Sequence, residues 1–171
     1  MDLSKQLNEL NRQLLDSGVQ FALIGGLAVN AHARPRATAD IDLLVGVSDR
    51  QNLQHALESL GYKRLDERED IASYIRGSER VDAVFARRKH AVAFLDEATP
   101  IGGYVNLPVV SAEALVALKL QGFNNDPRRL QDLADIIAIV DHLGAALDVE
   151  RLRQYFELFD QLPLFEELFS Q

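Results

Sequence analysis

Apolar residues follow a helical period at the start of the chain and shorter periods after it. Four leucines spaced by four, three and four residues predict a helix over residues 2–16, which ends at Gly18. The leucines on that face are Leu3, Leu7, Leu10 and Leu14. The apolar run that follows, VQFALI at residues 19–24, comes directly before two glycines and predicts a buried strand.

Short apolar runs between turn-forming residues predict further strands. These are residues 38–45, 62–65, 71–76 and 80–85, with 91–95 and 104–110 as weaker strand or loop candidates. A short helix over 27–32 and an amphipathic helix over 49–60 lie between them. From Ser111 onward the pattern predicts helices over 112–121, 127–142 and 148–159 and a short final turn after Pro163. The pattern therefore predicts an α+β fold with a helical C-terminal tail.

Composition narrows the class of protein. The chain has 171 residues, the size of about one domain, and a formal net charge of −8, which disfavours broad, nonspecific binding to nucleic acid. It has no cysteine, which excludes disulfides, thiolate zinc sites and a cysteine nucleophile. No apolar run reaches the roughly 18 residues of a membrane span, and the polar N-terminus is unlike a secretory signal. We therefore expect a cytoplasmic location and no membrane partner.

Candidate chemistry lies at Gly25-Gly26 and at Asp40-Ile41-Asp42. Strand alternation predicts that Asp40 and Asp42 point to the same side, where two bare carboxylates would repel each other unless a divalent cation bridges them. Oxygen ligands suit Mg²⁺ (or Mn²⁺), which takes one or two carboxylates and completes its coordination with substrate phosphates. The glycines would allow phosphate to approach the backbone. Asp82, an acid in an otherwise apolar strand, is a third candidate ligand.

The segment from Phe21 to Val45 resembles the signature of the DNA polymerase beta-like nucleotidyltransferases. It is most similar to their AbiEii-type branch, whose pattern is a Gly-Gly followed by R-x-T-x-D-I-D, matched here by Arg36, Thr38, Asp40 and Asp42. The resemblance implies a nucleotidyltransferase fold with a mixed sheet flanked by helices. Residues 1–110 would form the catalytic core, and residues 111–171 a helical region packed on it within a single compact domain.

The resemblance continues in the tail. The branch has a helix with a Lys, followed by an R-x-x-K-D-x-x-D helix. In this chain Lys119, Asp132 and Asp135 match, the pair Arg128-Arg129 supplies the arginine, with Arg129 as the candidate, and Gln131 stands in place of the motif's Lys. The chain is shorter than many toxins of the branch, which leaves the acceptor and toxicity open.

The roles that follow are predictions. Asp40, Asp42 and Asp82 would be catalytic and would hold the metal, with Asp82 also able to take the proton of an acceptor hydroxyl. The residues predicted to bind the nucleotide are Gly25, Gly26, Arg36, Thr38, Lys119 and Arg129. Asp132 and Asp135, on one helix face, would hold Lys119 or Arg129 in place. For Thr38 a purely structural role is at least as plausible, and Arg36 and its neighbour Arg34 are equally well explained as solvated loop charges.

Three functions remain open. The first is NMP transfer from an NTP to tRNA, other RNA or protein, as in the toxin of a toxin–antitoxin pair with a cognate antitoxin. The second is nucleotidyl transfer to a small molecule such as an antibiotic. The third is a nonenzymatic interaction protein with the same fold, against which the three carboxylates argue. The four histidines show no metal-ligand spacing, and the tail aromatics are typical of core packing or of a partner interface.

Overall fold

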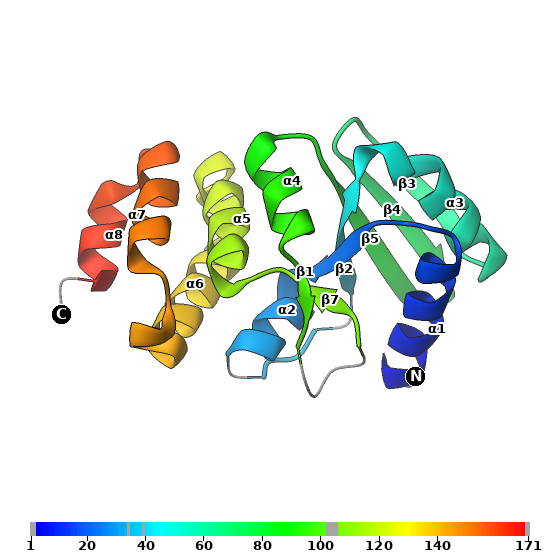
Figure 1. Ribbon diagram of the computed structural model, residues 1–171, viewed down its shortest axis with the longest axis horizontal. Coiled ribbons are helices and arrows are strands. Elements are labelled where there is room, and N and C mark those ends of the chain that lie inside the picture. Colours follow the sequence, from blue (N-terminus) through cyan, green and yellow to red (C-terminus); the bar gives the residue numbers. More distant parts are fainter. Residues whose placement is uncertain (1–2, 34, 39, 102–105, 170–171) are drawn as a thin grey trace. The chain divides into compact units, whose positions relative to one another are not determined.

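The computed structural model describes residues 3–33, 35–38, 40–101 and 106–169 (Figure 1). They form two compact units. The first unit comprises Met1–Ala28 and Ala37–Val110, and the second comprises Val29–Arg36 and Ser111–Gln171. The second unit thus contains the C-terminal helices together with a short segment from well before them. Whether the two units pack as one compact domain stays a prediction.

A seven-stranded sheet forms the centre of the first unit, in the order β3-β4-β5-β2-β1-β7-β6. The strands are β1 (Phe21–Ile24), β2 (Ile41–Gly46), β3 (Lys63–Glu67), β4 (Ile71–Arg76), β5 (Glu79–Ala86), β6 (Thr99–Pro100) and β7 (Pro108–Val109). The pairs β2–β5 and β1–β7 are parallel and the other neighbours are antiparallel, so the sheet is mixed. This confirms the α+β class. Residues 104 and 105 of the last predicted strand lie outside the described residues.

Helices cover the sheet of the first unit. They are α1 (Leu3–Asp16), α3 (Arg50–Ser59), which follows the short η1 (Val47–Asp49), and α4 (Lys89–Asp96). Helix α1 buries Leu7, Leu10 and Leu14, as its leucine spacing predicts, and packs against α3 beside the strands (Figure 1). The turn that follows it contains Gly18, whose φ of +66° favours glycine.

The prediction of a strand or loop at residues 91–95 is wrong, because this segment forms part of helix α4. Its buried residues are Ala91, Phe94 and Leu95, spaced three and four apart, and the helix packs on β2 and β5. Five apolar residues in a row are compatible with either structure, and the sheet supplies the surface that favours the helix here.

Strand β2 begins at Ile41, three residues later than the sequence predicts. Its partner β1 ends at Ile24, which lies opposite Asp42, because α2 (Gly25–His32) starts there. Without a partner strand on that side, the backbone before Ile41 leaves the ladder. Asp40 therefore lies outside the regular strand, at an exposed position.

The second unit is helical after Ser111. It contains α5 (Ala112–Asn125), α6 (Leu130–Leu143), the short η2 (Gly144–Ala146), α7 (Val149–Leu158) and α8 (Leu162–Phe169). Helix α6 starts three residues later than predicted, because the Asp126 side chain accepts a hydrogen bond from the Arg128 backbone and forms a turn first.

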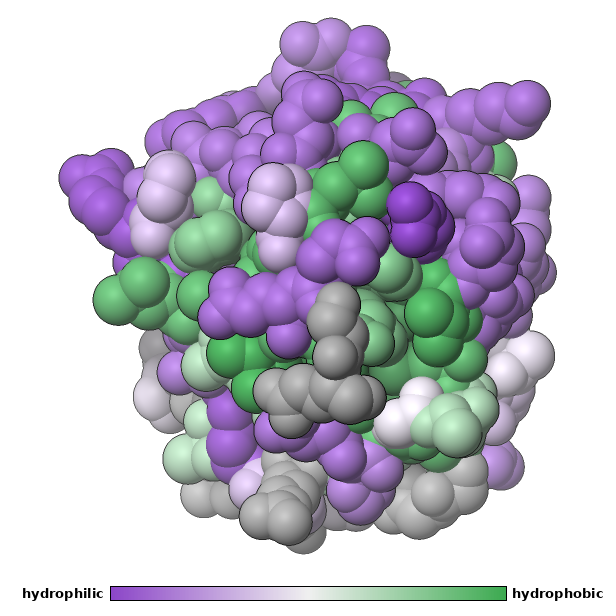
Figure 2. Space-filling model, turned by 90° about the vertical axis from the view of Figure 1, so that its left-hand side faces the viewer, coloured by the Kyte–Doolittle hydropathy of each residue, from purple (hydrophilic) through white to green (hydrophobic). Residues whose placement is uncertain are grey.

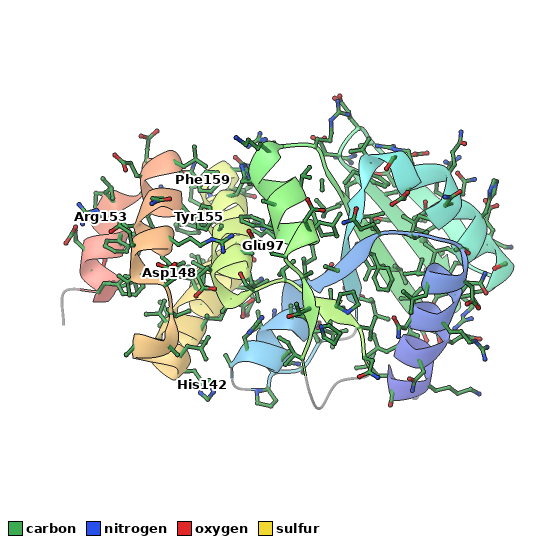
Figure 3. The ribbon with its side chains drawn as sticks, viewed as in Figure 1. Glu97, His142, Asp148, Arg153, Tyr155 and Phe159 are labelled. Carbon is green, nitrogen blue, oxygen red and sulfur yellow. The ribbon has the colours of Figure 1, made fainter. Side chains whose placement is uncertain are left out.

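The aromatic residues of the tail pack inside the second unit. Phe156 and Phe165 are buried with ring centroids 5.5 Å apart, and the Phe159 side chain, at the end of α7, is also buried (Figure 3). This confirms core packing for these three rings. The face of the molecule shown in Figure 2 mixes apolar with polar side chains. Leu158, the last residue of α7, is 58% exposed. No helix among the described residues has the length and apolar character needed to cross a bilayer.

Candidate active site

Two of the predicted metal ligands lie side by side in the sheet of the first unit. In the parallel pair of β2 and β5, Asp42 is the register partner of Asp82. Partner residues on neighbouring strands project from the same face, and the strands are about 4.8 Å apart, so the two carboxylates share one side of the sheet. The other side of β5 is apolar, since Val81, Ala83 and Phe85 are buried in the core. Asp82 therefore projects from the face of β5 opposite to these three side chains.

Gly25 is fitted to the carboxylate of Asp42. A Cβ at position 25 would stand 1.9 Å from Asp42 Oδ2, far inside contact distance, and the φ of Gly25 is +64°. Only glycine satisfies both conditions without strain. The sequence predicts that this glycine serves phosphate approach, whereas the structure shows that it first makes room for a carboxylate. Gly26 follows as a buried residue of α2.

Asp82 is held by an arginine that the sequence analysis missed. Arg80 Nε donates hydrogen bonds to Asp82 Oδ1 at 3.1 Å and Oδ2 at 2.9 Å, and Arg80 Nη2 donates to Ser73 Oγ at 3.4 Å. The hydrogen bond and charge of Asp82 raise the pKa of Arg80, and the charges of Asp40 and Asp42 add to this. The i, i+2 spacing of Arg80 and Asp82 on a strand was the available signal.

The carboxylates of the first unit have the donor chemistry of a magnesium site. Oxygen ligands from one or two carboxylates are what Mg²⁺ ordinarily takes from a protein, and Asp42 and Asp82 supply that number. Among the described residues, however, no three acidic, histidine or cysteine side chains converge closely enough to hold a metal together. Thr38, also predicted in this region, lies in the irregular segment before β2. The metal role of all three acids stays a prediction.

The second unit brings together the other predicted residues in a buried ion network. Lys119, which is only 8% exposed, places Nζ 2.9 Å from Asp132 Oδ1 and 2.7 Å from Asp135 Oδ2. Arg129 Nε lies 2.6 Å from Asp132 Oδ2. Arg36 Nε and Nη2 donate to the two oxygens of Asp135 at 2.8 and 2.9 Å. The two acids thus hold all three predicted nucleotide-binding cations.

Asp135 is the centre of this network. Burial raises the pKa of Asp135, but hydrogen bonds from Arg36 and Lys119 outweigh it, so the pKa lies below its usual range. Gln131, which stands where the motif has a Lys, donates from Nε2 to Asp135 Oδ1 at 2.8 Å. The amide therefore keeps the contact to the acid without adding a charge. Lys119 is buried with its charge balanced, and its role toward a triphosphate stays a prediction.

Two further residues support the network and have no signal in the sequence pattern. Asn30 exchanges two hydrogen bonds of 2.8 Å with the backbone of Arg36 and so fixes the start of that side chain. A Cβ at Gly122 would stand 2.8 Å from Asp132 Oδ2, so this glycine of α5 makes space for the carboxylate on α6. Both contacts join residues distant enough in sequence that only the fold reveals them.

One of the four histidines, all of which are expected at the surface or at a helix end and not as metal ligands, lies at the end of α6. His142 is exposed in the last turn of α6 (Figure 3).

Comparison with known proteins supports the fold through structure alone. No family model matches the sequence, and a search of the curated proteins finds no match. The antibiotic-resistance factor ANT(2'')-Ia superposes with a TM-score of 0.71 and 16% identity over 96% of this chain and 95% of that one. The lincosamide antibiotic adenylyltransferase LnuA gives 0.57 and 18% over 79% and 96%. A CCA-adding enzyme solved with ATP gives 0.50 and 16%, and this chain spans about half of it, 52%.

These similarities are too low in identity to show more than architecture. They agree with the mixed sheet and the C-terminal helices described above, and nothing among them bears on the AbiEii-type branch in particular. The chain shares the α+β fold of these nucleotidyltransferase structures.

Proposed function

We propose that this protein is a metal-dependent nucleotidyltransferase that moves an NMP from an NTP to an acceptor hydroxyl. The observation that carries the proposal is the in-register pair of Asp42 and Asp82 on one face of the sheet, beside a glycine that a side chain could not replace. Like charges in such proximity are costly unless a cation neutralises them. Arg80 pairs with Asp82, and a divalent cation would neutralise the two acids together.

The residues would divide the work as follows. Asp42, Asp82 and Asp40 would hold Mg²⁺ or Mn²⁺, which, when bound, neutralises charge on the phosphates. Asp82 would accept the proton of the acceptor hydroxyl. Arg36 and Arg129, whose side chains are 31% and 59% exposed, would stabilise the charge that develops on pyrophosphate, with Asp135 and Asp132 orienting them.

The test is transfer of label from α-labelled NTPs in the presence of Mg²⁺. We expect Asp42→Asn to lower transfer about 10²-fold or more while the protein stays folded. Asp16→Asn removes the same charge at an exposed position of α1 and is the matched control, which should transfer normally. Equal activity of the Asp42→Asn variant and the control would refute the metal role. Absence of both transfer and NTP binding in the parent protein would leave only an interaction protein.

For the acceptor, a small hydroxyl-bearing molecule is the first candidate. ANT(2'')-Ia, solved with adenylyl-2''-tobramycin, matches 94% of this chain and 98% of its own length, so the two proteins have similar extent. The net charge of −8 also favours an acceptor without a phosphate backbone. Labelled product that migrates with an added aminoglycoside or lincosamide would support this acceptor class.

The second candidate is an RNA or protein acceptor, in the manner of a toxin with a cognate antitoxin. It is favoured by the R-x-T-x-D-I-D motif at Arg36 to Asp42, which resembles the AbiEii-type branch. Incubation with total tRNA and with cell protein, resolved on denaturing gels, distinguishes it from the first. Label on tRNA or protein, with none on small molecules, would reverse the order of the two candidates.

A further inference from the structure

Arg80 covers the third carboxylate of the candidate site. Its Nε donates to both oxygens of Asp82, at 3.1 and 2.9 Å, and Nη2 reaches Ser73 Oγ on the neighbouring strand β4. Ser73 is the register partner of Asp82, so the guanidinium lies along one cross-strand row. The Arg80 side chain is 45% exposed, against 15% for Asp82. A partly exposed cation therefore occupies the carboxylate that a metal would need.

The same cation balances more than one acid. The charges of Asp40 and Asp42 act on the guanidinium as well as the charge of Asp82. A guanidinium and a divalent ion compete for the lone pairs of a carboxylate and repel each other. Arg80 also offers a reason why Asp82 does not converge with other acids into a three-ligand group among the described residues.

We propose that Arg80 is the counter-cation of the metal-free site: it holds Asp82 until a divalent ion binds, and it makes binding of that ion depend on the nucleotide. The inference rests on the proposed function for the identity of the ligand. The metal alone must displace a bound guanidinium and gains only protein oxygens. A metal–triphosphate complex brings its own oxygen ligands and also an anion that the released guanidinium can contact. Arg80 is thus a positioning residue that couples metal binding to nucleotide binding.

The experiment measures Mn²⁺ affinity by electron paramagnetic resonance of the free ion, with and without NTP. In the absence of nucleotide, we expect Arg80→Gln to bind Mn²⁺ about tenfold more tightly than the parent protein, which is about 1.4 kcal/mol. Arg80→Lys keeps the charge but loses the Nε contact, and we expect an intermediate affinity. NTP should tighten Mn²⁺ binding most in the parent protein, less in Arg80→Lys and least in Arg80→Gln. A purely structural ion pair would not produce this trend.

Arg68→Gln is the matched control. Arg68 pairs with Asp66 two residues away in the chain, with Nε 3.2 Å from Oδ2, and its loss changes the net charge equally. We expect it to leave Mn²⁺ affinity unchanged. Unchanged or weaker Mn²⁺ binding by Arg80→Gln, or an equal gain in the Arg68 control, would overturn the proposal.

A second substitution separates this proposal from the proposed function. Adding Asp42→Asn to Arg80→Gln should abolish the gain, because the extra affinity requires the carboxylate cluster. If the gain appears and disappears in this way but no NMP transfer is found, the arginine proposal stands and the transferase proposal fails. If transfer occurs and depends on Asp42 but Arg80→Gln shows no gain, the reverse holds.

Discussion

Substituting Gly25 with alanine tests whether backbone space, and not only acidic residues, builds the candidate site. The new Cβ would stand 1.9 Å from Asp42 Oδ2, and ordinary contact begins at about 3.4 Å. Either the carboxylate or the start of α2 must therefore move by about 1.5 Å. Misplacement of a reacting group by about 1 Å can cost about 10²-fold in rate. We expect Gly25→Ala to lower both Mn²⁺·NTP affinity and transfer by about that factor.

The chain contains controls for the backbone component of this effect. Gly18 and Gly77 have φ of +66° and +61°, close to the +64° of Gly25, and a Cβ at either would meet nothing within 4 Å. In all three positions alanine pays the left-handed backbone strain, about 1–2 kcal/mol. Only Gly25→Ala adds the steric clash, worth about 1–3 kcal/mol. Urea unfolding should therefore rank Gly25→Ala below both controls, which should keep full metal binding.

A double substitution identifies the clashing partner. In an Asp42→Ala background the two nearest atoms, Oδ2 and Cγ, are gone and only the Asp42 Cβ remains, at 2.7 Å. The cost of Gly25→Ala should fall there, and the difference is the coupling energy of the pair. Additive unfolding energies, or metal affinity in Gly25→Ala within about threefold of the Gly18→Ala control, would refute the reasoning.

Three predictions concern the second unit. Asp135→Asn should lower the free energy of unfolding by about 3 kcal/mol, because it leaves buried Lys119 with one acid fewer; a loss under about 1 kcal/mol in urea would contradict this. Folding lowers the pKa of Asp135, because hydrogen bonds from Arg36 and Lys119 outweigh the effect of burial. The contribution of Asp135 to stability is therefore complete above its unfolded pKa of about 3.9. That contribution is lost as the pH falls through the lower pKa of the folded state. Unfolding midpoints measured from pH 6 downward should show this loss, and Asp135→Asn should remove part of it. Gly122→Ala, normally stabilising in a helix by up to about 1 kcal/mol, should instead destabilise, because its Cβ would stand 2.8 Å from Asp132 Oδ2; a higher unfolding midpoint would show that the carboxylate yields without cost.

Much of the fold follows from local patterns in the amino-acid sequence. The leucine spacing of the first helix predicts its length and buried face, and both agree with α1. The hairpin of β4 and β5 is predicted within a residue or two, because alternation and a glycine turn are both encoded in adjacent positions. The prediction for residues 91–95 is wrong for the opposite reason. An apolar run too short to show a period takes the conformation that its neighbours favour, and here β2 and β5 favour a helix.

For the candidate site, too, local sequence predicts some features and strand pairing decides others. The sequence predicts the three candidate acids, Asp40, Asp42 and Asp82, from residue type and spacing. This is possible because a strand places alternate side chains on one face by its own geometry. The pairing of Asp42 with Asp82 depends on the parallel register of two strands about 40 residues apart, which no local pattern contains. The start of β2 at Ile41, and with it the place of Asp40, depends on where β1 stops.

By itself, then, the sequence determined the order of the elements, the faces they bury and the identity of the acids, because these depend on neighbours within a few positions. Only the tertiary structure decided which charges meet. It paired Arg36 with Asp135 across 99 positions and set Gly25 against the carboxylate of Asp42. A charge in a sequence has no fixed partner, and its function as ligand, counter-ion or support is set by the atoms that folding brings within hydrogen-bonding distance.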